Sequence, residues 1–217
     1  MSQEHPILCL FGASENAGFP LILVIGREPN ADKPVTNFLG PYDFRLAPRC
    51  GFWNTAYGVA ARILGVSTLA LKQRCVQQDG SPIVFADALP QGILNHVGGK
   101  DVRRATIPPN DVLRHIDNLF SHKPIMDRVG LVIVSGLGDS TFAIARQAIE
   151  RQCSERNLPL ARVAFFYPTN TTKILGQLSA DQREIIGQAF VQLSEHKTDT
   201  RGSAGYARAH SADLILP

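Results

Sequence analysis

The sequence predicts an α/β protein, a three-layer α/β/α sandwich built on a short, mainly parallel sheet. Two observations carry this prediction. Several short segments are almost entirely apolar, which is typical of strands buried on both faces. These segments alternate along the chain with longer ones whose apolar residues recur at helical spacing, and this alternation is typical of a parallel sheet covered by helices.

The first predicted strand is residues 21–25, an apolar run that stops at Gly26. A long stretch rich in proline, residues 26–51, separates it from the first predicted helix. Residues 52–65 form that helix because their apolar positions recur at helical spacing and the segment ends at Gly65. Long ordered loops in compact domains are often functional, so residues 26–51 are a candidate functional region.

The middle of the chain predicts one more strand and one more helix. Residues 81–90 form a short buried strand closed by Pro90. Residues 108–123 form a helix opened by prolines and capped by Asn110 or Asp111.

The last part of the chain predicts half of a βαβ unit and a final strand and helix. Residues 129–152 are a strand, a glycine turn and a helix in immediate succession. Residues 161–170 are a strand ended by proline, and residues 179–196 are an amphipathic helix with Ser179 as its cap. Since there is no internal repeat or linker, residues 1–217 are expected to form a single domain.

Composition sets limits on the class of protein. The 217 residues are 44% hydrophobic and 19% charged, enough to bury a sizeable core. A net charge of +3 permits a polyanionic partner but falls short of an architectural nucleic-acid binder. The start of the chain lacks a basic segment with a long apolar run, and no stretch is apolar enough for a membrane span, so a cytoplasmic location is expected.

The cysteines do not indicate a metal centre. Cys9, Cys50, Cys75 and Cys153 show no CxxC spacing and no pairing with histidine, so neither zinc nor an iron–sulfur cluster is predicted. Reduced thiols in an intracellular protein are expected.

Three strand exits are candidates for the functional site, because ligands of parallel sheets bind at the carboxyl ends of the strands. The exits at residues 26–30 and 167–173 are polar and contain a proline. The third exit, "SGLGDS" at 135–140, has Gly136 and Gly138, which can cradle a phosphate at a helix start. Thr141 takes the place of a third glycine and no Walker lysine follows, so a tight turn is favoured.

The order of these segments resembles the uracil-DNA glycosylase superfamily, most closely its mismatch-specific uracil/thymine branch. Residues 26–30, "GREPN", are similar to the branch's Gly-Ile-Asn-Pro-Gly motif, and residues 40–53 to its base-stacking loop followed by a helix that opens with Phe-Trp. Residues 84–90 look like its second strand, 132–145 like its strand-turn-helix, and 165–173 like its Asn-Pro-Ser-Gly-Leu-Ser-Arg motif. The similarity in order and spacing extends over roughly residues 20 to 196.

Four positions depart from that pattern. Glu28 stands where the branch has asparagine and the classical uracil enzymes have aspartate, so an oxygen that can activate water is kept on a longer arm. Arg27 replaces an apolar residue and Asn30 a glycine. Tyr167 replaces the asparagine or histidine that steadies the leaving base.

The residues also indicate a chemistry by themselves. Cleavage of an N-glycosidic bond passes through a cationic sugar, which the carboxylate of Glu28 can stabilise while it orients a water. The leaving base needs a hydrogen-bond donor, which Tyr167, Asn170 or a backbone amide of the loop 168–172 can supply. A flipped base needs an aromatic face, for which Phe44 is the first choice and Tyr42 the second. Lys173 is a candidate for contact with phosphate.

The sequence therefore predicts a metal-free and cofactor-free DNA glycosylase that hydrolyses the N-glycosidic bond of a damaged or mismatched, uracil-like base flipped out of DNA. Its predicted catalytic residues are Glu28 and Tyr167. The predicted substrate-binding residues are Gly26, Arg27, Pro29, Asn30, Tyr42, Phe44, Pro168, Thr169 and Asn170, and Lys173 is predicted at the DNA backbone. Two alternatives stay open. One is a non-catalytic nucleic-acid or nucleotide-binding module on the same fold, in which Glu28 is only a strand-end ion pair. The other is an unrelated doubly wound enzyme that holds a small phosphorylated ligand at residues 135–140.

Overall fold

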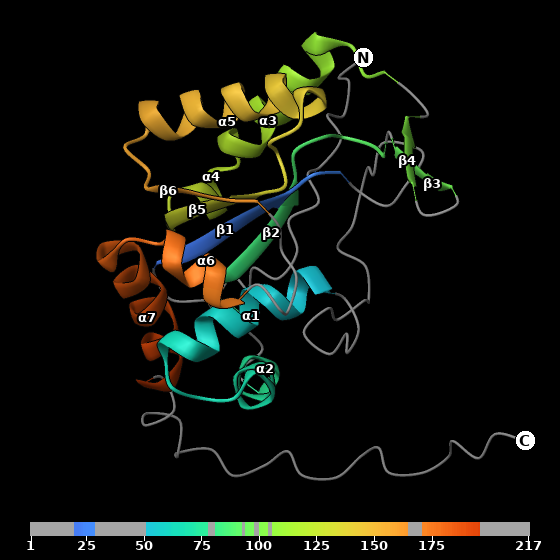
Figure 1. The fold of residues 1–217 in the computed structure, drawn as a ribbon. Coiled ribbons are helices and arrows are strands. Elements are labelled where there is room, and N and C mark those ends of the chain that lie inside the picture. The colour runs from blue at the N-terminus through green and yellow to red at the C-terminus, as the bar shows by residue number, and fades with distance from the viewer. Residues whose placement is uncertain are drawn as a thin grey trace, which may run out of the picture.

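The computed structural model of the chain describes residues 20–28, 51–77, 81–92, 94–97, 100–103, 106–164 and 171–195. Its centre is a parallel sheet of four strands in the order β2-β1-β5-β6 (Figure 1). The strands are β1 (Leu21–Gly26), β2 (Ile83–Asp87), β5 (Val129–Ser135) and β6 (Leu160–Val163). Helices lie on both faces of this sheet, so the structure is the three-layer α/β/α sandwich that the sequence predicts.

One outer layer consists of α3 (Pro109–Ser121), α4 (Lys123–Met126) and α5 (Ala143–Glu155). A single 3₁₀ turn, η2 (Ser140–Phe142), leads into α5. Buried side chains of these helices, such as Ile116 and Ile149, share one core with Leu23 of β1. This face of the sheet is called the α3/α5 face below.

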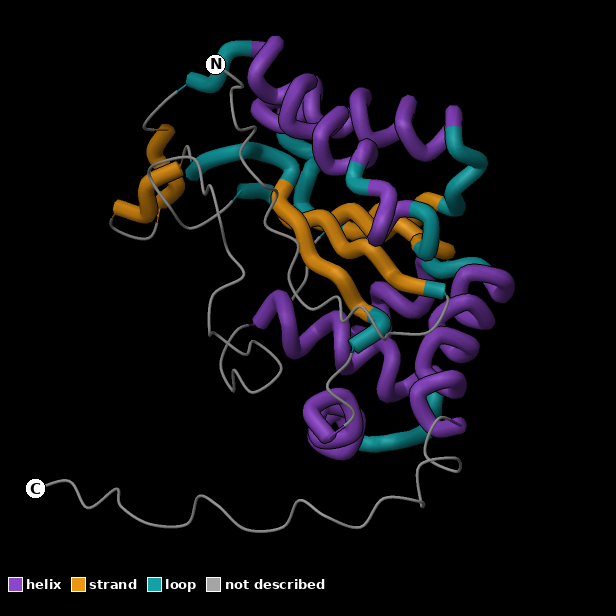
Figure 2. The backbone as a smooth tube through the Cα atoms, turned by 180° about the vertical axis from the view of Figure 1, so that it is seen from behind, coloured by secondary structure: helices purple, strands orange, loops and turns teal. Residues whose placement is uncertain are grey.

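The other outer layer consists of α1 (Gly51–Ile63), α2 (Thr68–Gln77), α6 (Thr171–Gln177) and α7 (Ala180–Glu195). Figure 2, the view from behind, shows these helices together on one side of the sheet and α3 and α5 on the other. Tyr57, Ile174 and Phe190 of this layer share a second core with Val24 of β1. This face is called the α1/α6 face below.

The central strand β1 shows why both cores form. Its side chains alternate between the two faces, with Leu21, Leu23 and Ile25 in the α3/α5 core and Ile22 and Val24 in the α1/α6 core. All six residues of β1 are buried. An uninterrupted apolar run is therefore what this position in the sheet requires.

A small antiparallel hairpin accompanies the sandwich. Its strands, β3 (Leu94–Val97) and β4 (Lys100–Arg103), pair with each other and not with the parallel sheet. The hairpin lies to the side of the sheet, beyond the carboxyl end of β2 (Figure 1). The sequence did not predict it.

Two of the predicted helix ends are confirmed. Helix α1 ends before Gly65, whose φ of +65° is the left-handed conformation that favours glycine after a helix. Ser179 caps α7 through a reciprocal pair of bonds: Gln182 N donates to Ser179 Oγ at 3.1 Å, and Ser179 N donates to Gln182 Oε1 at 2.9 Å. This is a capping box.

Other predicted boundaries are wrong. Neither Asn110 nor Asp111 caps α3, because the N-cap residue is Pro108 and no side chain bonds there. The carboxylate of Asp111 is instead bound by Arg114, one turn further along. The strand predicted over 81–90 is limited to β2, and the strand predicted over 161–170 begins at Leu160 and ends at Val163, before a bend at residue 164.

No helix in the described ranges combines the length and the apolar character that crossing a membrane would require.

Candidate functional site

The carboxyl edge of the sheet brings three strand exits together. Gly26 at the end of β1 is the partner of Asp87 at the end of β2, and Ala88 N donates to Gly26 O at 3.0 Å. On the other side of β1, the exit of β5 continues through Gly136, whose N–H donates to Val163 O at 3.2 Å. Residues that follow β1, β2 and β5 therefore share one edge, as the parallel topology predicts.

Glu28 and Asp87 lie near each other at this edge. Alternation along β2 puts Ile83 and Phe85 in the α1/α6 core, so Asp87 falls on the same face. Glu28 follows the end of β1 by two residues, after a bend at Arg27. The electrostatic effect of Glu28 on Asp87 agrees with this placement.

Asp87 sits in an environment that favours its protonated form. Burial first, and the negative charge of Glu28 second, raise the pKa of the Asp87 carboxyl from 3.8 to about 7. Glu28 itself is half-buried. Two carboxyl groups at one half-buried edge are the arrangement in which proton transfer can be tuned to neutral pH.

His115 supports the backbone at the same point. Its Nε2 lies 2.9 Å from Asp87 O, and since a carbonyl only accepts, Nε2 carries the hydrogen and donates. Burial lowers the pKa of the His115 imidazole, and the bond to the Asp87 carbonyl opposes that shift. A neutral imidazole from α3 thus fixes the end of β2.

Arg27 points to the opposite face of the sheet. Its guanidinium carbon lies 5.0 Å from the ring centroid of Phe142, which is fully buried in the α3/α5 core. The stem of Arg27 runs so close to Gly136 that a Cβ there would lie 3.0 Å from both Arg27 Cγ and Cδ. Arg27 therefore packs the exit of β1 against the exit of β5.

In the turn after β5, side chains of the turn and of α5 bond to its backbone amides and carbonyls. Asp139 Oδ1 accepts from Thr141 N at 2.7 Å, and Arg146 Nη1 donates to Leu137 O at 3.0 Å. Gly136 has a φ of +74°, as expected for a tight turn. A carboxylate bonded at the start of the 3₁₀ turn is unfavourable for a phosphate at the same amides, which argues against the phosphorylated-ligand alternative.

The segment 167–173, predicted as a base-contacting loop, is partly helical. Residues 171–173 form the first turn of α6, so Lys173 is an exposed helical residue. Next to it, Arg62 of α1 donates to Thr172 Oγ1 at 2.5 Å. Both cations are exposed in the α1/α6 layer.

Several predicted site residues lie outside the described residues, among them Tyr167, which was paired with Glu28. They are Pro29, Asn30, Tyr42, Phe44, Tyr167, Pro168, Thr169 and Asn170. Of the predicted site, the structure thus describes Gly26, Arg27, Glu28 and Lys173.

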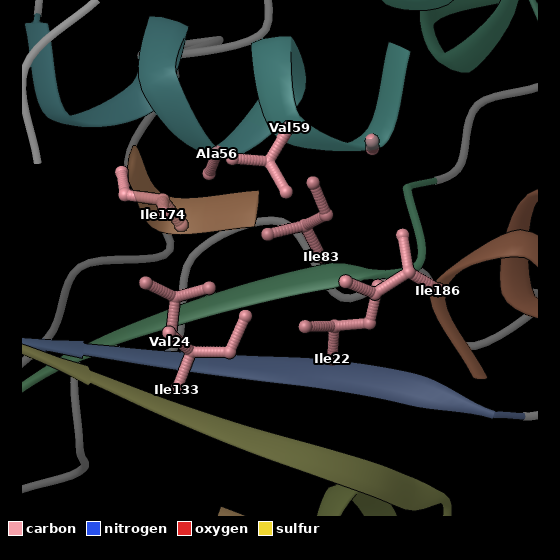
Figure 3. Close-up of a pocket in the computed structure, with 9 residues that line it drawn as sticks. Ile22, Val24, Ala56, Val59, Ile83, Ile133, Ile174 and Ile186 are labelled. Atoms are coloured by element: carbon pink, nitrogen blue, oxygen red, sulfur yellow. The ribbon is translucent and has the colours of Figure 1, made fainter. Parts of the chain in front are cut away.

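A small cavity lies under the α1/α6 layer, away from the polar groups. Its volume is about 10 Å³, roughly that of one water. Figure 3 shows isoleucine, valine and alanine side chains from β1, β2, β5, α1, α6 and α7 around it. A nucleobase does not fit into this space, so the cavity is a packing defect in the core.

Sequence reasoning missed Asp87 as a site residue. The segment 84–90 was assigned to a strand, but its one carboxylate at the strand exit was not singled out. The sequence did contain a signal for this residue. Asp87 directly follows a short apolar run, and Glu28 comes shortly after another. Polar residues at the ends of adjacent parallel strands meet at one edge.

The two cysteines that the structure describes, Cys75 and Cys153, are both buried and form no disulfide. Burial raises the pKa of the Cys153 thiol to about 12, which keeps it unreactive. Among the described side chains, no group of three or more His, Cys, Asp or Glu comes together to hold a metal ion.

Comparison with known protein families finds no family that matches the chain, and comparison with curated proteins finds no matching protein.

Proposed function

We propose that this protein is a DNA glycosylase that hydrolyses the N-glycosidic bond of a damaged or mismatched base flipped out of DNA. The observation that supports the proposal is the carboxylate of Glu28 at the exit of the central strand, half-buried and next to Asp87. The resemblance of the motif order to the uracil-DNA glycosylase superfamily agrees with it.

Glu28 has the properties that this reaction demands. As the bond between the base and C1′ lengthens, positive charge develops on the sugar, and a fixed carboxylate stabilises that charge. The same carboxylate orients the attacking water and accepts its proton. Partial burial strengthens both effects, because the local dielectric is lower than that of water.

The rest of the proposal concerns binding. Lys173 and Arg62, both exposed on the α1/α6 layer, suit the phosphates of the DNA backbone. Phe44, or else Tyr42, stacks on the base, and Tyr167 or Asn170 contacts its carbonyl oxygen. The reaction as proposed needs neither a metal nor a cofactor, and the proposed location is the cytoplasm.

A non-catalytic nucleic-acid-binding module is the second candidate. The pair of exposed cations on α1 and α6 favours it as much as it favours an enzyme, because phosphate contacts serve binding and catalysis alike. The two candidates differ in what Glu28 does.

The test compares Glu28→Gln with wild type in single-turnover cleavage of duplexes that carry uracil, hypoxanthine or a thymine mismatch, scored as abasic sites. Glu28→Gln keeps the shape and loses the charge, so cleavage should fall about a hundredfold or more. Duplex affinity should hold or rise, because a carboxylate near phosphates repels them.

Glu184→Gln is the matched control. Glu184 is exposed on α7, where its Oε1 accepts from Gln188 within the same helix, so the variant removes one charge away from the carboxyl edge. It should cleave like wild type. Equal cleavage rates for wild type and Glu28→Gln would mean that Glu28 forms only an ion pair at the strand end and takes no part in cleavage. Binding of every duplex without cleavage would favour the binding module.

A further inference from the structure

We propose that Asp87 is the general acid of the site, and that the protein acts on bases that accept a proton as they leave, the purine type. This inference rests on the proposed function and names the partner of Glu28. It gives the two carboxyl groups opposite roles, with Asp87 as the proton donor and Glu28 as the proton acceptor.

The position of Asp87 is the first support. It is the residue opposite Gly26 in the parallel register, and Glu28 follows Gly26 by two residues. Alternation along β2 assigns Asp87 to the α1/α6 face, and Glu28 follows the end of the neighbouring strand β1. This is also the face on which α6 begins with Thr171 and α1 begins with Gly51.

The charges around Asp87 are the second support. Burial first, and the negative charge of Glu28 second, favour the protonated form of Asp87, so its carboxyl retains a proton near neutral pH. From α3, His115 faces only the backbone carbonyl of Asp87 and is neutral. Arg27 packs against Phe142 on the other face.

Two described cations of the α1/α6 layer lie on α1 and α6. Arg62 is held by Thr172, and Lys173 is exposed on α6. Besides burial, the charge that acts on Asp87 is that of Glu28. Asp87 is therefore the group of the pair that holds the proton.

The proton balance of the reaction is complete with water alone. The bond between C1′ and the base nitrogen breaks, and its electron pair goes to the base. The proton of Asp87 moves to a ring nitrogen of the base, and water adds its oxygen to C1′ and gives a proton to Glu28. Transfer of that proton from Glu28 to Asp87, directly or through solvent, restores the starting state.

The substrate class follows from the charge of the leaving group. A base that departs as an anion would leave next to the negative charge of Glu28, which is unfavourable. A purine such as hypoxanthine has ring nitrogens that accept a proton, so it departs neutral if Asp87 supplies one. Uracil leaves as a stabilised anion and gains less from a general acid.

The experiment measures single-turnover cleavage of hypoxanthine and uracil duplexes from pH 5 to pH 9 by wild type, Asp87→Asn and Asp127→Asn. For wild type, hypoxanthine cleavage should fall with an alkaline limb centred near pH 7, where Asp87 loses its proton. Asparagine keeps the shape and a hydrogen-bond donor but transfers no proton. Asp87→Asn should therefore cleave hypoxanthine about a hundredfold more slowly at pH 6, without the alkaline limb, and uracil less than tenfold more slowly.

Asp127→Asn is the control for charge. Asp127 is exposed in the turn before β5, at the opposite edge of the sheet, and its variant should keep the wild-type profile. Thermal unfolding of each variant shows that it is folded, and Asp87→Ser serves as a second variant without the acid.

An alkaline limb that persists in Asp87→Asn and Asp87→Ser, or an equal loss on both bases, would overturn this inference. If Glu28→Gln still abolishes cleavage in that case, the proposed function stands. A wild type that cleaves neither duplex would overturn both.

Discussion

The carboxyl of Asp87 keeps its proton up to about pH 7, whereas an ordinary aspartate has a pKa of 3.8. The cause is its place in the fold: the end of a buried strand, with a second carboxylate across the register. In the unfolded chain this environment is absent. Folding therefore takes up a proton at Asp87 between these two pH values, and the stability of the fold depends on pH through this residue.

Asp87→Asn should stabilise the protein at alkaline pH. The folded-state pKa is raised, so the native state binds more protons than the unfolded state between pH 3.8 and about 7, and wild-type stability falls as pH rises through this window. Asparagine carries no charge and avoids this loss. At pH 8 the variant should be more stable than wild type by up to a few kcal/mol, and at pH 4 the difference should be small, as measured by urea unfolding.

Asp127→Asn again provides the comparison, since this exposed residue should change stability little at either pH. A difference between Asp87→Asn and wild type that is equal at pH 4 and pH 8 would show that the effect does not come from the titration of Asp87.

At the scale of the element, the turn between β5 and α5 requires glycine at position 136 but not at position 138. Gly136 has a φ of +74°, and a Cβ there would press on the stem of Arg27 at 3.0 Å. Gly138, two residues on, has open space where its Cβ would be and no such backbone requirement. The two glycines of "SGLGDS" look alike in the sequence and have different roles in the structure.

Gly136→Ala should destabilise the protein by about 1–3 kcal/mol, because it combines a left-handed backbone with close contact to Arg27. Gly138→Ala should be within about 0.5 kcal/mol of wild type, as expected of an exposed position without strain. Urea unfolding of both variants measures the difference. Equal stabilities would mean that the turn adjusts at Gly136 without cost.

The elements also show what a sequence can and cannot predict. Strands β1, β2 and β5 were predictable because each contains an almost entirely apolar run, whereas β6 is interrupted by the exposed Arg162. Helix α2 was not predicted, because its buried side carries Lys72 between apolar residues, with Nζ lying 5.7 Å from the ring centroid of Tyr57. The hairpin β3–β4 was missed because its strands are short and partly charged.

The candidate site follows the same division. That the exits of β1 and β5 share an edge was predictable from the parallel topology alone. That Asp87 lies at this edge was predictable in the same way, but its position opposite Gly26 was not, because it depends on the register of β1 against β2, and register is a tertiary property. The predicted α3 cap was wrong because proline fixes the start of the helix without help from a side chain.

For the whole molecule, we propose the α1/α6 layer as the side that meets DNA. Alternation along β2 assigns Asp87 to this face of the sheet, and Arg62 and Lys173 are exposed on its helices. Arg62 donates to a hydroxyl and Arg183 to backbone carbonyls, and these contacts add no negative charge. Positive charge on this layer would attract the phosphates of DNA.

Lys173→Ala should weaken DNA binding and its dependence on salt. Each phosphate contact releases counterions, so loss of one contact should lower the slope of log affinity against log salt by about one unit. Lys123→Ala is the matched control, because Lys123 is equally exposed but begins α4 in the opposite layer. A titration of duplex at several salt concentrations measures both. A slope that Lys173→Ala leaves unchanged would remove α6 from the DNA interface.

The strand order also determines when the chain can complete its sheet during synthesis. The central strand β1 pairs with β2 and with β5, and roughly 50 residues separate the ends of those two partners. At about 5–20 residues per second, a ribosome takes seconds to add them. Throughout that interval β1 and β2 can pair, while the other edge of β1 has no strand beside it and its backbone groups are unpaired. The side chains of β1, which are buried in the finished protein, are not yet covered by β5. An edge of this kind attracts other chains, so the nascent protein is a natural client for a chaperone until Ser135 has left the exit tunnel.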